Sequence, residues 1–345
     1  MAQSKRAERA VVAISALLVV AVVASASILI VQNKRAALAD RQRETNHLLN
    51  SAEASINRSL LSVDLLLAQT GKLLAKVSAS DVGTTKAADS GSSAPAEQVN
   101  GVLRSLAIQS LLIRHLSILR RDGVVLSSSD GNAQRLGFEL PANFLQEVLA
   151  PKGPGLSLSS PVLSFARSER VMYLARLITL DNAEPAIALA EVSISRLTAN
   201  TVRSIAFDGL EITLERATGE LLASEPSNEA LLGTKLVPPL DVRTNKAGEF
   251  AELKSRIIGL PAMVAARPTL YPGLMVTASL PIDVALAESE PVRRSIVWGT
   301  VVSVLLIAGL ATLVRSYIYR LGRTRIDIAA SKADRKSTRL NSSHQ

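Results

Sequence analysis

Two uncharged apolar runs, one near each end of the chain, constrain the fold more than any other feature. The first occupies residues 10–31 and the second occupies 296–314. A helix rises about 1.5 Å per residue, so roughly 20 apolar residues cross a hydrocarbon core about 30 Å thick. Both runs reach that length, and mostly polar residues lie between them. The sequence therefore predicts transmembrane helices at 10–32 and 295–314, enclosing one folded region at 33–293.

Basic residues beside the two runs indicate an orientation, because cytoplasmic flanks collect Lys and Arg. Three basic residues precede the first run and four follow the second: Lys5, Arg6, Arg9, Arg315, Arg320, Arg323 and Arg325. We therefore expect a bacterial inner-membrane protein with residues 1–9 and a linker helix at 315–333 in the cytoplasm. The region between the spans is then periplasmic. The inner flanks are basic too, which reduces the contrast.

A cleaved signal peptide is the alternative interpretation of the first run. Ala24, Ser25 and Ala26 match the small-residue pattern of a cleavage site. The apolar stretch continues to Val31, however, and is longer than the usual core of a signal peptide. An uncleaved anchor is therefore favoured.

The C-terminal segment 334–345 has an unusual composition. Its residues from Asp334 to His344 read DRKSTRLNSSH, which can be encoded by a nucleotide sequence that resembles a widely used sequencing adapter. We expect the natural reading to end near Ala333 and a C-terminal output module to be missing. A genuine basic, serine-rich tail is the alternative.

The chain carries 39 basic and 30 acidic residues, a formal net charge of +9, and no cysteine. A basic chain suggests a nucleic-acid partner at first. The cations are spread out, however, and many flank the apolar runs, so contact with membrane lipid explains the charge better. No nucleic-acid partner is expected. The absence of cysteine excludes a disulfide framework and a thiolate metal site.

Residues 33–78 have the pattern of one long helix. Apolar residues recur there at steps of three and four. These steps also fit a seam with a 3.5-residue period, so the helix is expected to pack on its own domain and in a homodimer. The next segment, 79–98, carries Gly, Ser, Thr and Pro and predicts a loop, and a short helix is expected at 99–110. The apolar positions of the long helix are Leu49, Ala52, Ile56, Leu60, Val63, Leu67 and Leu74.

The rest of the exported region contains an internal repeat. Residues 116–128 predict a strand, a tight Asp-Gly turn and a second strand, and a similar pattern follows at 212–224, at an offset of 96. Further matches have shorter offsets, and a helical segment follows each copy, near 195–205 and 283–294. The sequence therefore predicts two copies of one α+β module, at 99–205 and 206–293. The shorter offsets are 91, from Met172–Arg176 to Met263–Arg267, and 87, from Ile187–Ser193 to Leu274–Leu280.

A membrane anchor, a long helix, two tandem modules that begin with hairpins and a second span together resemble the double Cache sensor region of bacterial transmembrane receptors. The resemblance implies an α+β fold in which a long N-terminal helix lies beside two PAS-like antiparallel sheets. It also implies extracytoplasmic sensing, with the copy at 99–205 membrane-distal and the copy at 206–293 membrane-proximal. The signal would pass to the missing output module.

The segment after the second span bears on the type of output. It lacks the early proline that is typical of a HAMP relay, which favours a histidine kinase of a two-component system or a diguanylate cyclase over a chemoreceptor. The remaining alternative is a non-enzymatic membrane scaffold whose exported region binds a periplasmic partner protein and whose pocket has collapsed.

No motif for catalysis is visible in this fragment. The three histidines, His47, His115 and His344, lack zinc-ligand spacing, so no metal is expected. The glycines at 151–155 lack the Lys-Ser/Thr of a P-loop, and no Gly-x-Ser-x-Gly elbow occurs. We expect no enzymatic activity and no cofactor, and an exported hydrolase lacks a visible pair of nucleophile and base.

Ligand binding is the activity that remains. The resemblance places a small molecule on the concave sheet face of the first module, where Arg170, Tyr173, Arg176 and Ser128 are the candidates. Arg176 can pair with a carboxylate and Tyr173 can stack. Alternation along a strand puts both arginines on one face and Tyr173 on the other unless a bulge intervenes. The alternative is that the arginines are solvated, Tyr173 is core and Ser128 serves the turn.

Overall fold

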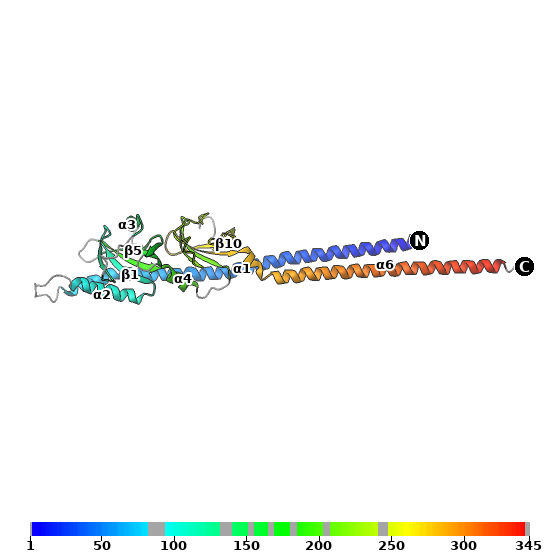
Figure 1. Cartoon of the computed structure of the whole chain (residues 1–345), viewed down its shortest axis with the longest axis horizontal. Helices are drawn as coiled ribbons and strands as arrows, with labels where there is room; N and C mark the ends of the chain where they lie inside the picture. The colour runs from blue at the N-terminus through cyan, green and yellow to red at the C-terminus, as the bar shows by residue number, and fades with distance from the viewer. Residues whose placement is uncertain are drawn as a thin grey trace. The chain divides into compact units, whose positions relative to one another are not determined.

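The computed structural model of the 345-residue chain describes residues 2–81, 94–131, 140–150, 155–164, 169–179, 185–202, 208–240 and 248–341. It divides into two compact units (Figure 1). The terminal unit comprises Met1–Asp40 and Ala285–Gln345, and the central unit comprises Arg41–Val284. The central unit contains part of one long helix, two antiparallel sheets and several shorter helices, so the predicted α+β class is confirmed.

The terminal unit is built from two long apolar helices. Helix α1 (Ala2–Asp81) includes the first apolar run and helix α6 (Glu290–Asn341) includes the second. Both are long and apolar enough to cross a membrane, and their most apolar windows bury no residue within the protein. Leu17 and Leu305 are 71% and 65% exposed, which is costly in water and favourable in hydrocarbon. The expected linker, 315–333, is helical as part of α6.

From Arg41 onward, α1 belongs to the central unit and packs against its sheets. Its predicted apolar positions from Leu49 to Leu67 are all 5% exposed or less, so the predicted stripe on this helix is confirmed. Leu74 lies outside the residues whose side chains are described. Leu61 and Leu65 lie on another face of the helix and are 42% and 53% exposed. The stripe from Leu49 to Leu67 is thus buried within the central unit and cannot also form the dimer seam, and the homodimer itself remains a prediction.

The first module is an antiparallel sheet with helices on both faces. Its strand order is β2-β1-β6-β5-β3, and β4 also pairs with β5. Of the predicted loop 79–98, residues 79–81 belong to α1, 94–98 begin α2 and 82–93 lie outside the described residues. Pro95 is compatible with α2 because proline is tolerated in a first helical turn. The elements are α2 (Ala94–Gln109), β1 (Ile113–Leu119), β2 (Val125–Ser128), α3 (Phe144–Leu149), β3 (Ser157–Leu158), β4 (Val162–Ser164), β5 (Glu169–Thr179), β6 (Pro185–Ser193) and α4 (Ile194–Val202).

The second module repeats this sheet with the order β8-β7-β11-β10-β9. Both leading hairpins turn at a glycine with φ +88°, Gly123 and Gly219, a backbone region that disfavours other residues. The helix predicted near 283–294 is two helices, α5 and the start of α6. The elements are β7 (Glu211–Arg216), β8 (Leu221–Glu225), β9 (Ala251–Lys254), β10 (Pro261–Pro268), β11 (Leu274–Pro281) and α5 (Ile282–Ala287).

Strand pairing tests the predicted repeat. Ser117 and Thr213 are separated by the predicted offset of 96, and they pair with Leu189 and Thr277. The offset from β6 to β11 is therefore 88, and the predicted 87 is wrong by one residue. Leu189 and Thr277 in turn pair with Ala175 and Ala266, which confirms the offset of 91 between β5 and β10. A slip of one residue exchanges the two faces of a strand. Both faces of β11 are buried, so its sequence has no apolar alternation that fixes the register.

Candidate functional site

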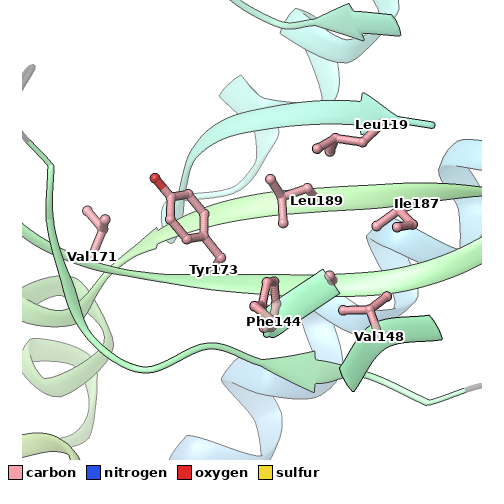
Figure 2. Packing of buried hydrophobic residues seen from close by; sticks show 8 residues of the cluster. Leu119, Phe144, Val148, Val171, Tyr173, Ile187 and Leu189 are labelled. Atoms are coloured by element: carbon pink, nitrogen blue, oxygen red, sulfur yellow. The ribbon is translucent and has the colours of Figure 1, made fainter. Parts of the chain in front are cut away.

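The candidate site lies on the face of the first sheet that is opposite α1. Alternate residues of β1, β5 and β6 point to this face and pack against Phe144 and Val148 of α3 (Figure 2). The side chains that meet there form an apolar cluster in the centre of the face, and its buried members are Leu119, Phe144, Val148, Val171, Tyr173, Ala175, Ile187 and Leu189.

One end of this face is polar. His115 of β1, Glu191 of β6 and Tyr173 of β5 are register partners on three neighbouring strands, so their side chains form one row across the sheet. We call these three residues the polar row. Glu191 and Tyr173 are 5% and 6% exposed. The His115 Nδ1 lies 3.2 Å from an Asp130 carboxylate oxygen, which places a second acid beside the row.

The electrostatics of the polar row favour a protonated tyrosine. Burial of the ring, and then the negative charge of Glu191, raise the pKa of Tyr173 to about 12. The hydroxyl of Tyr173 therefore remains a hydrogen-bond donor at neutral pH. A carboxylate acceptor and a phenol donor lie close together on a buried face, and this combination suits a small polar molecule that carries its own donors and acceptors.

Serine hydroxyls next to the polar row are already engaged with the protein. Ser117 and Ser128 face each other across β1 and β2, with their hydroxyl oxygens 3.3 Å apart. The Ser159 hydroxyl accepts a hydrogen bond of 2.8 Å from the backbone N–H of Tyr173, and Ser129 accepts one of 3.1 Å from that of Leu116. These bonds fix the backbone around the row.

The structure places the four residues proposed from sequence on two faces. Tyr173 and Ser128 lie on the face of the polar row, and Arg170 and Arg176 lie on the opposite face, because the pairing of β5 with β6 continues without a bulge. Arg176 forms an ion pair with Asp64 of α1. The four side chains therefore do not converge on one site, and the role of each in ligand binding remains a proposal.

Sequence reasoning missed Glu191, considered His115 only as a metal ligand, and did not foresee the contact of His115 with Asp130 of the hairpin. One signal for Glu191 was present, because this carboxylate stands in phase with Ile187 and Leu189 in an otherwise apolar strand. A charge in such a position is buried and needs a partner or a ligand. No comparable local signal exists for Asp130, which approaches His115 only through the β1–β2 hairpin.

A second group of polar contacts joins α1 to both modules. Asp64 of α1 pairs with Arg176 of the first module, and its other carboxylate oxygen accepts a hydrogen bond of 3.4 Å from the hydroxyl of Tyr271 in the second. Burial and the Asp64 charge raise the pKa of Tyr271 to about 12. Asn57 of α1 also accepts a bond of 2.9 Å from the backbone N–H of Leu270. We call Asp64, Arg176 and Tyr271 the α1 junction.

Replacing Asp64 with alanine is expected to destabilise the central unit by about 1–3 kcal/mol, because Arg176 and Tyr271 both lose a half-buried acceptor. The check is denaturant unfolding of the full chain in lipid nanodiscs. The matched control is Asp122→Ala, which breaks the exposed Arg120–Asp122 pair and should cost less than about 1 kcal/mol. Equal losses for the two variants would show that the α1 junction adds no stability.

Comparisons with known proteins bear on the fold. No protein-family model matches the sequence, and no curated protein matches it. A solved extracellular domain from a protein assigned as a histidine kinase is 19% identical, with a TM-score of 0.54 over 72% of this chain and 98% of that one. The ligand-binding domain of the Pseudomonas fluorescens chemoreceptor CtaA, in complex with L-isoleucine, is 14% identical, with a TM-score of 0.51 over 74% and 98%. The central unit therefore has the fold of these sensor domains, as the double Cache resemblance implied.

Proposed function

We propose that this chain is an extracytoplasmic sensor that binds a small molecule in its first module and transmits the event across a membrane. One observation carries the proposal. Glu191 and Tyr173 of the polar row are buried on the face of the first sheet that is opposite α1, within a fold shared with solved sensor domains. The apolar helices at both ends supply the connection through a bilayer.

The proposed location is the bacterial inner membrane, with the central unit in the periplasm and both ends in the cytoplasm. The basic residues outside the two apolar runs support this orientation, and they also provide contacts for lipid headgroups. The chain itself has no catalytic role in this proposal. The output is a histidine kinase or diguanylate cyclase module, with a chemoreceptor as the second candidate because one structural neighbour is a chemoreceptor domain.

Signalling requires that the ligand prefer one of two arrangements of the central unit, since equal affinity for both shifts no equilibrium. The α1 junction supports a route for this shift. Asp64 contacts the first module through Arg176 and the second module through Tyr271, so a change at either contact alters the other. We further propose a homodimer in which the exposed Leu61 and Leu65 of α1 contact a second copy.

The ligand proposed for the first module is a small molecule that donates hydrogen bonds to Glu191 and accepts one from Tyr173. Thermal unfolding of the full chain in nanodiscs, with a panel of amino acids, amines and organic acids, tests this. At 100 times its Kd, a ligand stabilises the folded state by about 2.7 kcal/mol. Glu191→Gln and Tyr173→Phe should each remove most of the stabilisation, and the control Glu252→Gln, at an exposed position of β9, should retain it.

The scaffold that binds a partner protein remains the second candidate, because Phe144 and Val148 of α3 already fill the centre of the candidate face (Figure 2). The same experiment separates the two functions. If no compound stabilises the wild-type chain, the scaffold is favoured. If compounds stabilise the wild-type chain and the Glu191→Gln and Tyr173→Phe variants equally, the sensor function is supported but the polar row is not the ligand site.

A further inference from the structure

A cleft of about 610 Å³ lies between the two modules of the central unit. Its walls come from α3, β3 and β5 on one side and from β7, β11 and the β10–β11 turn on the other. The volume falls in the range of small-molecule sites, which often lie at interfaces between domains. Leu158, Leu177 and Leu274 give it apolar walls, and Glu147, Arg216 and Tyr271 supply polar groups.

The charges in the cleft are unevenly satisfied. Arg216 forms an ion pair of 2.8 Å with Glu220 and donates a hydrogen bond to the carbonyl oxygen of Leu158. Glu147 forms a longer ion pair of 3.8 Å with Arg216, a distance that is too great for a hydrogen bond. Within the described part of the chain, the Glu147 carboxylate accepts no hydrogen bond, and its side chain is 41% exposed. One guanidinium, that of Arg216, thus pairs with two carboxylates, Glu220 at 2.8 Å and Glu147 at 3.8 Å. The two acids exceed it by one negative charge, and Glu147, the more distant and more exposed of them, has capacity for another cation.

We propose that the inter-module cleft is a second ligand site, distinct from the polar row, for a small organic cation with an apolar body. The protonated nitrogen pairs with Glu147, and the apolar body packs against Leu158, Leu177 and Leu274. The site is built by both modules, so its ligand contacts both at once. Tyr271 lines the cleft and also donates to Asp64, which connects occupancy of the cleft to the α1 junction.

Isothermal titration of the full chain in nanodiscs with 2-phenylethylammonium tests the proposal, and the neutral 2-phenylethanol serves as the probe of similar shape. The cation should bind at least about tenfold more tightly than the alcohol. Glu147→Gln should weaken the binding of the cation by about tenfold. Leu177→Trp should abolish binding because the larger ring fills the cleft from a position that is 36% exposed. Glu229→Gln, at an exposed position outside the cleft, is the control and should bind as the wild type does.

Equal affinity for the cation and the alcohol, or unchanged binding in Glu147→Gln, would overturn the proposal. Glu191→Gln separates it from the proposed sensor function. If that variant loses the cation and Glu147→Gln retains it, the probe occupies the polar row, and the cleft is not a site. If Leu177→Trp has a lowered unfolding temperature, Glu147→Gln decides alone, because its exposed side chain leaves the fold intact.

Discussion

Replacing Arg256 with methionine is expected to lower the free energy of unfolding by about 3–5 kcal/mol. Arg256 and Glu215 form a bidentate ion pair in the second module, with side chains 2% and 0% exposed. Arg256 also donates a bond of 2.8 Å to the carbonyl oxygen of Pro238, and Thr213 donates one of 2.6 Å to Glu215. Without Arg256, the Glu215 carboxylate stays buried with no compensating charge, and this is the main cost.

Denaturant unfolding of the full chain in nanodiscs measures this loss, and two further variants identify its cause. The double variant Glu215→Leu/Arg256→Met should recover much of the stability, because apolar pairs often replace buried ion pairs at little cost. Arg120→Met is the control for losing an arginine, since Arg120 pairs with Asp122 at an exposed site, and it should cost less than about 1 kcal/mol. A double variant as unstable as Arg256→Met would contradict the explanation from an unpaired charge.

Leu174→Ala is expected to destabilise the protein by about 2–5 kcal/mol. Leu174 is fully buried on the face of β5 that carries Arg176, the partner of Asp64 on α1. Truncation to alanine removes apolar contacts and leaves a cavity on the face of the sheet that is nearer α1. The effect is large because close packing permits little relaxation around the lost side chain.

Leu177→Ala is the matched control for this prediction. Leu177 lies on the same strand, three residues later, but faces the opposite side and is 36% exposed. Its truncation should cost less than about 1.5 kcal/mol, because less apolar area leaves water on folding. Denaturant midpoints of the two variants provide the comparison. A larger loss for Leu177→Ala would contradict the assignment of faces along β5.

Several features followed from local patterns in the sequence. The length of the two apolar runs predicted helices that are long enough to cross a membrane, and the steps of three and four on α1 predicted the buried stripe from Leu49 to Leu67. The Asp-Gly turn at Gly123 and its counterpart at Gly219 predicted two hairpins and hence a repeated module. Each of these signals lies within a short stretch of chain, where residue spacing and backbone preference act directly.

The pairing of distant strands was decided by tertiary structure. The offset between β6 and β11 was wrong by one residue, because strands buried on both faces carry little alternation to fix their register. The polar row depends on the pairing of β6 with β1 and β5, which brings His115, Tyr173 and Glu191 together from three strands. No spacing in the sequence specifies such a row.

Charged side chains show the same division. Sequence alternation correctly separated Arg176 from Tyr173, because side chains of successive strand residues point to opposite faces. It did not reveal the partners Asp64 for Arg176 or Glu215 for Arg256. Local periodicity fixes the direction of a side chain relative to its own strand. Only the packed fold decides what stands opposite it, because that depends on contacts between segments far apart in the chain.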